Sequence, residues 1–189
     1  MTTDHIVTQH CCPDCQAKDE TIRMLRWNPT LNMLRAAGFD EAIRRLPDTT
    51  TYTVVICDID RLHAINSATG SYDQTDRYLA AGFAVRHGEF AGQLHDKCDE
   101  IGFVIDEQAR DTETDPDAFV ARIARQLAGQ PLTISERYAL AAAQRCHVSE
   151  ARLSATFATQ SGLTAAQVPG VIEVLSKEVL DMKNARNAG

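Results

Sequence analysis

The stretch YTVVICDID, residues 52–60, decides the fold. Its middle is a continuous apolar run from Val54 to Cys57, which is typical of a central strand covered on both faces. The stretch ends in two acids, Asp58 and Asp60, at the edge of the expected sheet, where ligands of α/β folds usually bind. It therefore predicts a buried strand that carries carboxylates into a candidate site. The alternative for these acids is a strand-end or helix-capping role.

Helical and strand-like segments alternate on both sides of this stretch. Apolar residues at helical spacing predict one helix after Pro116 and further helices over residues 17–27, 30–46, 74–87, 134–145 and 171–183. Shorter patterns predict strands at 94–95, 101–106 and 152–159 and a loop at 162–169. The alternation predicts an α/β (α+β) protein with a central mixed sheet of about five strands flanked by helices.

Composition limits the classes of function. The 189 residues are 44% hydrophobic and 24% charged, which is ordinary for one globular domain with a short appendage. The net charge of −7 argues against nucleic-acid binding as the main function, because that needs clustered Lys and Arg. No apolar run approaches the ~18 residues of a membrane span, and the polar first residues lack a signal-peptide core. We therefore expect a cytoplasmic location and no membrane partner.

Two further charged features complete a recognisable set. Asp99 and Glu100 lie in a polar turn between two short predicted strands, and Lys183 and Arg186 end the last predicted helix. Each alone has a structural explanation, as a solvated turn or as favourable charge against the helix dipole. With Asp58, however, they are the parts of a triphosphate site: carboxylates hold Mg²⁺, and basic side chains neutralise terminal phosphates.

The order and spacing of these residues resemble the GGDEF domain of diguanylate cyclases, over residues 28–187. NPTLNM (28–33) with Gly38-Phe39 resembles the opening Asp-x-Leu-Thr-Gly-Leu…Gly-Phe of that family. DIDRLHAIN (58–66) resembles its Asp-hydrophobic-Asp-x-Phe-Lys-x-Ile-Asn segment, and KCDEI (97–101) lies where Gly-Gly-Asp-Glu-Phe would be. The end of the last helix (180–187) resembles the Lys…Gly-Arg-Asn end. The resemblance implies the palm fold of nucleotidyl cyclases.

The resemblance also implies a metal-dependent site. Asp58 and Asp99 would bind two Mg²⁺ ions, assisted by the Ile59 carbonyl. Glu100 would lie beside the attacking ribose hydroxyl, as a metal ligand or as the base.

The nucleotide contacts implied by the resemblance come from three other residues. Asn66 would contact the guanine edge, while Lys183 and Arg186 would hold the β- and γ-phosphates of GTP. In the family two GTP-loaded domains face each other in a dimer, and each 3′-hydroxyl attacks the α-phosphate of the other GTP. Cyclic di-GMP and pyrophosphate are the products, and the two metal ions clamp the attacking and leaving oxygens.

Departures from the family pattern leave a second interpretation open. Lys97 and Cys98 replace the two signature glycines, which let a backbone approach a ligand closely. The family's second guanine contact falls on Thr75, and its Arg-x-x-Asp product-inhibition motif is absent. The alternative is therefore a catalytically retired domain, acting as a nucleotide sensor or as a partner-binding or dimerisation module.

The first residues form a separate Cys/His-rich head (1–16), followed by a predicted dimerisation helix (17–27) and the GGDEF-like domain (28–189). Cys12 and Cys15 are half of a zinc site, because a closed structural Zn²⁺ needs four ligands. Cys11, His10 and His5 are near enough in sequence for one chain to complete it, or two chains could each supply a pair of ligands. A reduced tail without metal is the alternative.

Residues 138–168 allow a competing interpretation as a helix-turn-helix of transcription regulators. In that interpretation Ser149 caps a second helix, Arg152 faces DNA, and Leu153 to Phe157 are helical rather than part of a strand. The acidic isoelectric point, about 5.3, and the few basic residues argue against it.

Overall fold

A six-stranded mixed sheet forms the centre of the fold in the computed structural model, which describes residues 18, 21–23, 25–69, 79–80, 82–95, 100–109, 115–129 and 153–187. The strands lie in the order β1-β2-β4-β5-β3-β6. Their bounds are β1 Trp27–Asn28, β2 Met33–Leu34, β3 Tyr52–Ile59, β4 Glu89–Gln93, β5 Glu100–Asp106 and β6 Ala155–Leu163. The helices are α2 Ala36–Arg44, α3 Leu62–Thr69, α5 Pro116–Ala128 and α7 Val168–Asn187. None of the helices in these ranges is long and apolar enough to cross a membrane.

β3 is the buried strand that its sequence predicts. It pairs antiparallel with β5 on one side and β6 on the other. β2 and β4 pair in parallel, which makes the sheet mixed, as predicted. Val54, Val55, Ile56 and Cys57 are all fully buried. Burial raises the pKa of the Cys57 thiol well above its ordinary value, with the neighbouring carboxylate of Asp58 adding to the effect.

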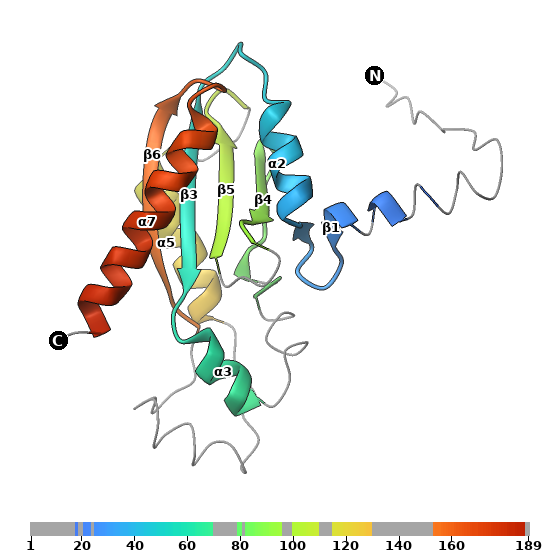
Figure 1. Ribbon diagram of the computed structural model, residues 1–189. Helices are drawn as coiled ribbons and strands as arrows, with labels where there is room; N and C mark the ends of the chain where they lie inside the picture. Colours follow the sequence, from blue (N-terminus) through green and yellow to red (C-terminus); the bar gives the residue numbers. More distant parts are fainter. Residues whose placement is uncertain are drawn as a thin grey trace.

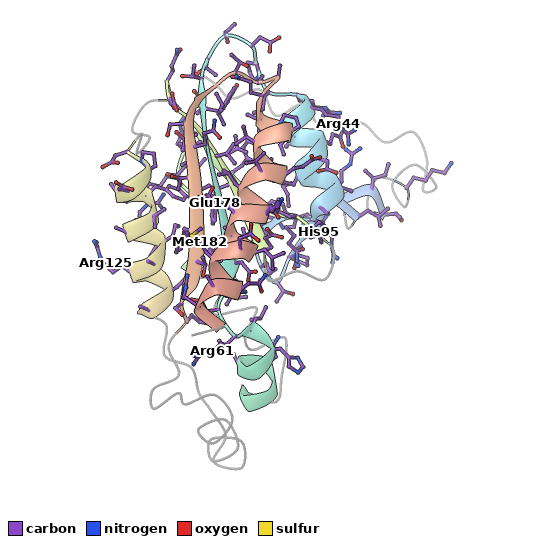
Figure 2. The ribbon with its side chains drawn as sticks, turned by 60° about the vertical axis from the view of Figure 1, so that its left-hand side comes forward. Arg44, Arg61, His95, Arg125, Glu178 and Met182 are labelled. Carbon is purple, nitrogen blue, oxygen red and sulfur yellow. The ribbon has the colours of Figure 1, made fainter. Side chains whose placement is uncertain are left out.

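Helices cover both faces of the sheet, because successive β3 side chains point to opposite faces. Val55, Cys57 and Ile59 join one core cluster with α5, and Val54 and Ile56 join another with α2 and α7. Figure 1 shows α2 and α7 in front of the sheet and α5 behind it. The labelled side chains of Arg125 on α5 and Glu178 on α7 likewise lie on opposite sides (Figure 2). The fold is therefore a three-layer α/β sandwich.

A pair of glycines lets α2 pack closely on the sheet. Gly92 on β4 and Gly102 on β5 are opposite each other in the register. A Cβ added to Gly92 would lie 2.4 Å from the Phe39 ring of α2, and one added to Gly102 would lie 2.7 Å from it. Phe39 is only 1% exposed, so the ring occupies the space that two absent side chains leave.

The helix predicted over residues 30–46 is wrong at its start. The side-chain oxygen of Asn28 accepts hydrogen bonds from the backbone N–H groups of Thr30 and Leu31, both at 3.1 Å, and Asn32 has a positive φ of 53°. This turn allows β2 to form before α2 begins, because asparagine tolerates such turn conformations. Trp27, predicted to end the preceding helix, lies in β1.

Other predicted boundaries also differ from the structure. The strand predicted at 94–95 is wrong; β4 lies earlier, in EFAGQ, which has no β-branched residue and forms by pairing with its neighbours. The helix predicted over 74–87 ends by Phe83. The loop predicted at 162–169 is shorter than expected, residues 164–167, since β6 runs through Leu163 and α7 starts at Val168. Helix α3 is an additional element, and the predicted helix at 134–145 lies outside the described residues.

Candidate functional site

The candidate site lies where β3 ends and β5 begins. Asp58 on β3 is directly opposite Glu100 on β5 and Thr156 on β6. Directly opposed residues of antiparallel strands place their side chains on the same face. All three side chains therefore point to the face that α7 covers, so residues far apart in the sequence meet at one end of the sheet.

Lys183 on α7 binds the end of β3. Its ammonium donates a hydrogen bond to Asp58 Oδ1 and a second to the Ile59 carbonyl oxygen, the latter at 3.3 Å. The side chains of Lys183 and Asp58 are 20% and 14% exposed. The resemblance implies that Asp58 and the Ile59 carbonyl are metal ligands and that Lys183 is a phosphate ligand. The structure brings the three groups together, with the two oxygens converging on one cation.

Two residues that the sequence analysis did not single out lie beside Glu100. The Ser176 hydroxyl donates a hydrogen bond to Glu100 Oε1, and His95 Nε2 lies 3.8 Å from Oε2. Ser176 precedes Lys183 by about two helical turns, so both lie on the same side of α7. That spacing is the signal that could have revealed Ser176. Helix α7 therefore supplies one partner to each of the two carboxylates.

Asp60 and Arg186 form a second group beside these carboxylates. The Asp60 carboxylate accepts hydrogen bonds from Thr156 Oγ1 at 2.8 Å and Ser154 Oγ at 3.0 Å. Arg186 donates to Thr156 Oγ1, and its Nη1 lies 3.6 Å from Asp60 Oδ2. The Arg186 side chain is 58% exposed, so its guanidinium is oriented by the sheet and remains accessible to solvent.

Asn66 lies on α3, the helix that follows β3. It is 9% exposed. Arg61, just before α3, has a positive φ of 57°, so the chain turns sharply between the strand and the helix. The guanine contact that the resemblance implies for Asn66 remains a prediction.

Comparison with known proteins gives a consistent picture of the fold. No family model and no curated protein matches the sequence. Solved structures do match. The diguanylate cyclase SiaD of Pseudomonas aeruginosa, in complex with its activator SiaC, aligns with a TM-score of 0.62 at 13% identity over 91% of this chain and 64% of that chain. A sensory box/GGDEF family protein from Caulobacter crescentus CB15 aligns with a TM-score of 0.54 at 16% identity, over 83% and 99% of the two chains.

The chain has the fold of a GGDEF domain. A third match is a microbial GGDEF domain whose interaction with cyclic di-GMP is described, with a TM-score of 0.53 at 16% identity, over 89% of this chain and 95% of that one. The GGDEF fold confirms the predicted palm architecture. At these identities the likeness concerns the fold alone.

The GGDEF fold leaves no place for the helix-turn-helix interpretation. That interpretation needs a helix from Leu153 to Phe157. Instead, β6 begins at Ala155 and pairs with β3 along its length, with Phe157 opposite Cys57. The helix-turn-helix prediction is therefore wrong, because the alternating apolar residues belong to a strand.

Several predicted site residues lie outside the described residues. They are the signature positions Lys97, Cys98 and Asp99 and the proposed zinc ligands His10, Cys11, Cys12 and Cys15. Within the described ranges, no group of three or more His, Cys, Asp or Glu side chains could hold a metal ion. Roles for these residues stay predictions.

The donor set at the end of β3 fits Mg²⁺. Mg²⁺ prefers oxygen ligands and is usually bound by one or two carboxylates together with phosphate oxygens. The Asp58 carboxylate and the Ile59 carbonyl are oxygen donors that already converge on one cationic group. Glu100 is directly opposite Asp58 in the register.

Proposed function

We propose that this chain is a GGDEF-like domain that binds a purine nucleoside triphosphate, GTP in the first place, together with Mg²⁺. The observation that carries the proposal is the convergence of the Asp58 carboxylate and the Ile59 carbonyl on one cation, beside Arg186. A carboxylate and a carbonyl at that position, next to basic side chains, are the groups that a metal-bound polyphosphate requires.

Each residue would have a distinct part in binding. Asp58 and the Ile59 carbonyl would hold Mg²⁺, with Asp99 as the further acidic ligand. Mg²⁺, when bound, would neutralise phosphate charge. Lys183 would leave Asp58 and bind the β- and γ-phosphates together with Arg186, whose orientation depends on Thr156 and Asp60.

Conversion to cyclic di-GMP would use the same residues in a homodimer. Each 3′-hydroxyl would attack the α-phosphate of the GTP on the other subunit. One P–O bond forms and the bond between the α- and β-phosphates breaks, so two GTP give one cyclic di-GMP and two pyrophosphates. Glu100, which is opposite Asp58 in the sheet and accepts a hydrogen bond from Ser176, would act as a metal ligand or as the base.

A nucleotide sensor without turnover, or a partner-binding or dimerisation module, is the second candidate. It is favoured by the salt bridge of Lys183 with Asp58, which satisfies the predicted metal ligand within the chain itself. The replacement of the signature glycines by Lys97 and Cys98 favours the same candidate.

One experiment separates these functions. GTP is titrated calorimetrically in Mg²⁺, with ATP and cyclic di-GMP as comparators, and the same samples are chromatographed for a cyclic dinucleotide. Asp58→Asn is the test variant, and Asp181→Asn, at an exposed position of α7, is the matched control. Micromolar GTP binding with product supports the cyclase, and binding without product supports the sensor. If no nucleotide binds, the proposal is wrong.

The zinc and dimer proposals have separate tests. Zinc content per chain after dialysis is expected to be stoichiometric if Cys11, Cys12, Cys15 and His10 hold the ion. Sedimentation analysis of the same samples measures the dimer. Metal-free protein that stays dimeric would exclude zinc as the element that joins the two chains.

A further inference from the structure

We infer that the ammonium group of Lys183 occupies the metal position of this site until a nucleotide binds. This inference rests on the proposed function, because it concerns the same site. Its basis is that one ammonium binds both oxygens, Asp58 Oδ1 and the Ile59 carbonyl, that would otherwise hold Mg²⁺.

The environment makes this contact a strong competitor for a metal ion. The side chains of Lys183 and Asp58 are four-fifths or more withdrawn from solvent, at 20% and 14% exposure. Charge pairs that are partly shielded from water attract each other more strongly than pairs in bulk water. A divalent cation reaching Asp58 must therefore displace an ammonium that is already bound, as well as shed some of its own water.

The neighbouring charged side chains that the structure describes have partners of their own. Glu100 accepts from the Ser176 hydroxyl, and Asp60 accepts from Ser154 and Thr156. Arg186 is directed to this second group and contacts Asp60 at 3.6 Å. Lys183 is thus the basic residue of α7 that the structure places on Asp58.

A polyphosphate would release Lys183. Terminal phosphate oxygens offer the ammonium a new anionic partner, so its departure exposes Asp58 and the Ile59 carbonyl to the metal ion. The metal and the nucleotide would then favour each other's binding, and the coupling factor is the same in both directions. The free protein would bind divalent ions weakly. The displacement of Lys183 would make the binding of the metal ion depend on the binding of the nucleotide.

The test measures metal binding without any nucleotide. Mn²⁺ is titrated into the full chain, and free Mn²⁺ is counted by its electron paramagnetic resonance signal. The variants are Lys183→Met, which keeps an unbranched side chain one atom shorter and removes its charge, and Lys177→Met, at an exposed lysine of the same helix, as control. We expect Lys183→Met to bind Mn²⁺ about tenfold more tightly than the wild type, and Lys177→Met to match the wild type.

Adding Asp58→Asn to Lys183→Met should abolish the gain, because the gain depends on the carboxylate that the lysine releases. Equal Mn²⁺ affinity in the wild type and Lys183→Met, or a gain that survives Asp58→Asn, would overturn the inference. Lys183→Gln serves as a second neutral variant if thermal unfolding shows that the methionine variant folds poorly. Failure of the wild type to bind GTP would refute the proposed function, whereas the Mn²⁺ comparison stands without nucleotide.

Discussion

The two ends of β3 hold their carboxylates in different ways. At the end that begins with Tyr52, Glu107 accepts hydrogen bonds from the hydroxyls of Thr51 at 2.7 Å and Thr53 at 2.8 Å, and from the Gly162 backbone N–H at 2.8 Å. At the other end, Asp58 is bound by the long side chain of Lys183 from α7.

We interpret the Glu107 arrangement as one that stabilises the fold and the Asp58 arrangement as one that serves a ligand. The donors around Glu107 are short neutral side chains and a backbone amide, and they connect the carboxylate to β6 and to the start of β3. Gly162 has a positive φ of 70°, a conformation that glycine adopts at little cost. The partner of Asp58 is the charged side chain of Lys183, which in our proposal moves to a phosphate when a nucleotide binds. A strand-end carboxylate held by its own sheet stabilises the fold, whereas one held by a displaceable cation is available to a ligand.

The largest expected effect is at the Asp58 end. Asp58→Asn should weaken Mg²⁺-dependent GTP binding by roughly 100-fold, since losing one member of a partly buried charged contact typically costs that much. The midpoint of thermal unfolding should fall less than in Glu107→Ala, because Lys183 keeps its hydrogen bond to the Ile59 carbonyl and is partly exposed to solvent. Calorimetric titration and a thermal melt on the same sample measure both quantities. If Asp58→Asn binds GTP with wild-type affinity, the nucleotide binds elsewhere, and the two ends of β3 do not differ in the way that we propose.

Glu107→Ala should give the reverse pattern. It removes the acceptor of three hydrogen bonds and leaves the buried Thr53 hydroxyl with only its contact to Ser161, so the free energy of unfolding should fall by about 2 kcal/mol. GTP affinity should stay at the wild-type value. Urea titration measures the stability, with Gln108→Ala at the exposed neighbouring position as control. A loss of GTP binding without a loss of stability would show that this end also serves a ligand.

A pH series sharpens the same comparison. Burial alone would raise the pKa of Glu107, but the hydrogen bonds from Gly162, Thr51 and Thr53 outweigh it and lower the pKa below its ordinary value of 4.5. A lowered folded-state pKa contributes stability above the unfolded-state value, and this stability is lost as the pH falls through the folded-state pKa. The difference in unfolding free energy between wild type and Glu107→Gln should therefore be constant above about pH 5 and shrink in acid. A difference that grows in acid would contradict this assignment.

The smallest expected effect is at Ser176. Ser176→Ala removes one hydrogen bond to Glu100, so the free energy of unfolding should fall by less than about 1 kcal/mol. GTP affinity should change only a few-fold, because Glu100 keeps its place opposite Asp58 in the sheet. Any cyclic dinucleotide formation should fall more than binding does. A loss of stability as large as that of Glu107→Ala would mean that the Ser176 hydrogen bond stabilises the fold and does not serve the site.

The sequence predicted the parts of the fold whose signals are local. The apolar run of β3 marks it as central, and Pro116 marks the start of α5, where the Asp115 side chain also accepts from the Asp117 N–H at 3.1 Å. β4 escaped prediction because EFAGQ has weak strand propensity and forms only when β5 is beside it. The turn set by Asn28 likewise hid β2 within an apparently helical pattern.

The candidate site shows the same limit. The structure brings together, at one end of the sheet, five of the residues that the sequence analysis names: Asp58, Ile59, Glu100, Lys183 and Arg186. The contact between Lys183 and Asp58 was not foreseen, because it depends on where α7 crosses the sheet. Ser176 and His95 were missed for the same reason, since their significance comes from Glu100, which is distant in sequence.

The Phe39 ring seated on Gly92 and Gly102 also has an evolutionary consequence. A methyl group at either glycine would collide with the ring, so neither glycine can change while Phe39 keeps its position. Loss of catalysis would relax selection on the carboxylates but not on this contact, because the contact fixes α2 to the sheet. Descendants of the same ancestor should therefore retain the glycine pair together with an aromatic residue at position 39. That triplet would mark kinship among chains that have drifted too far for ordinary sequence matching.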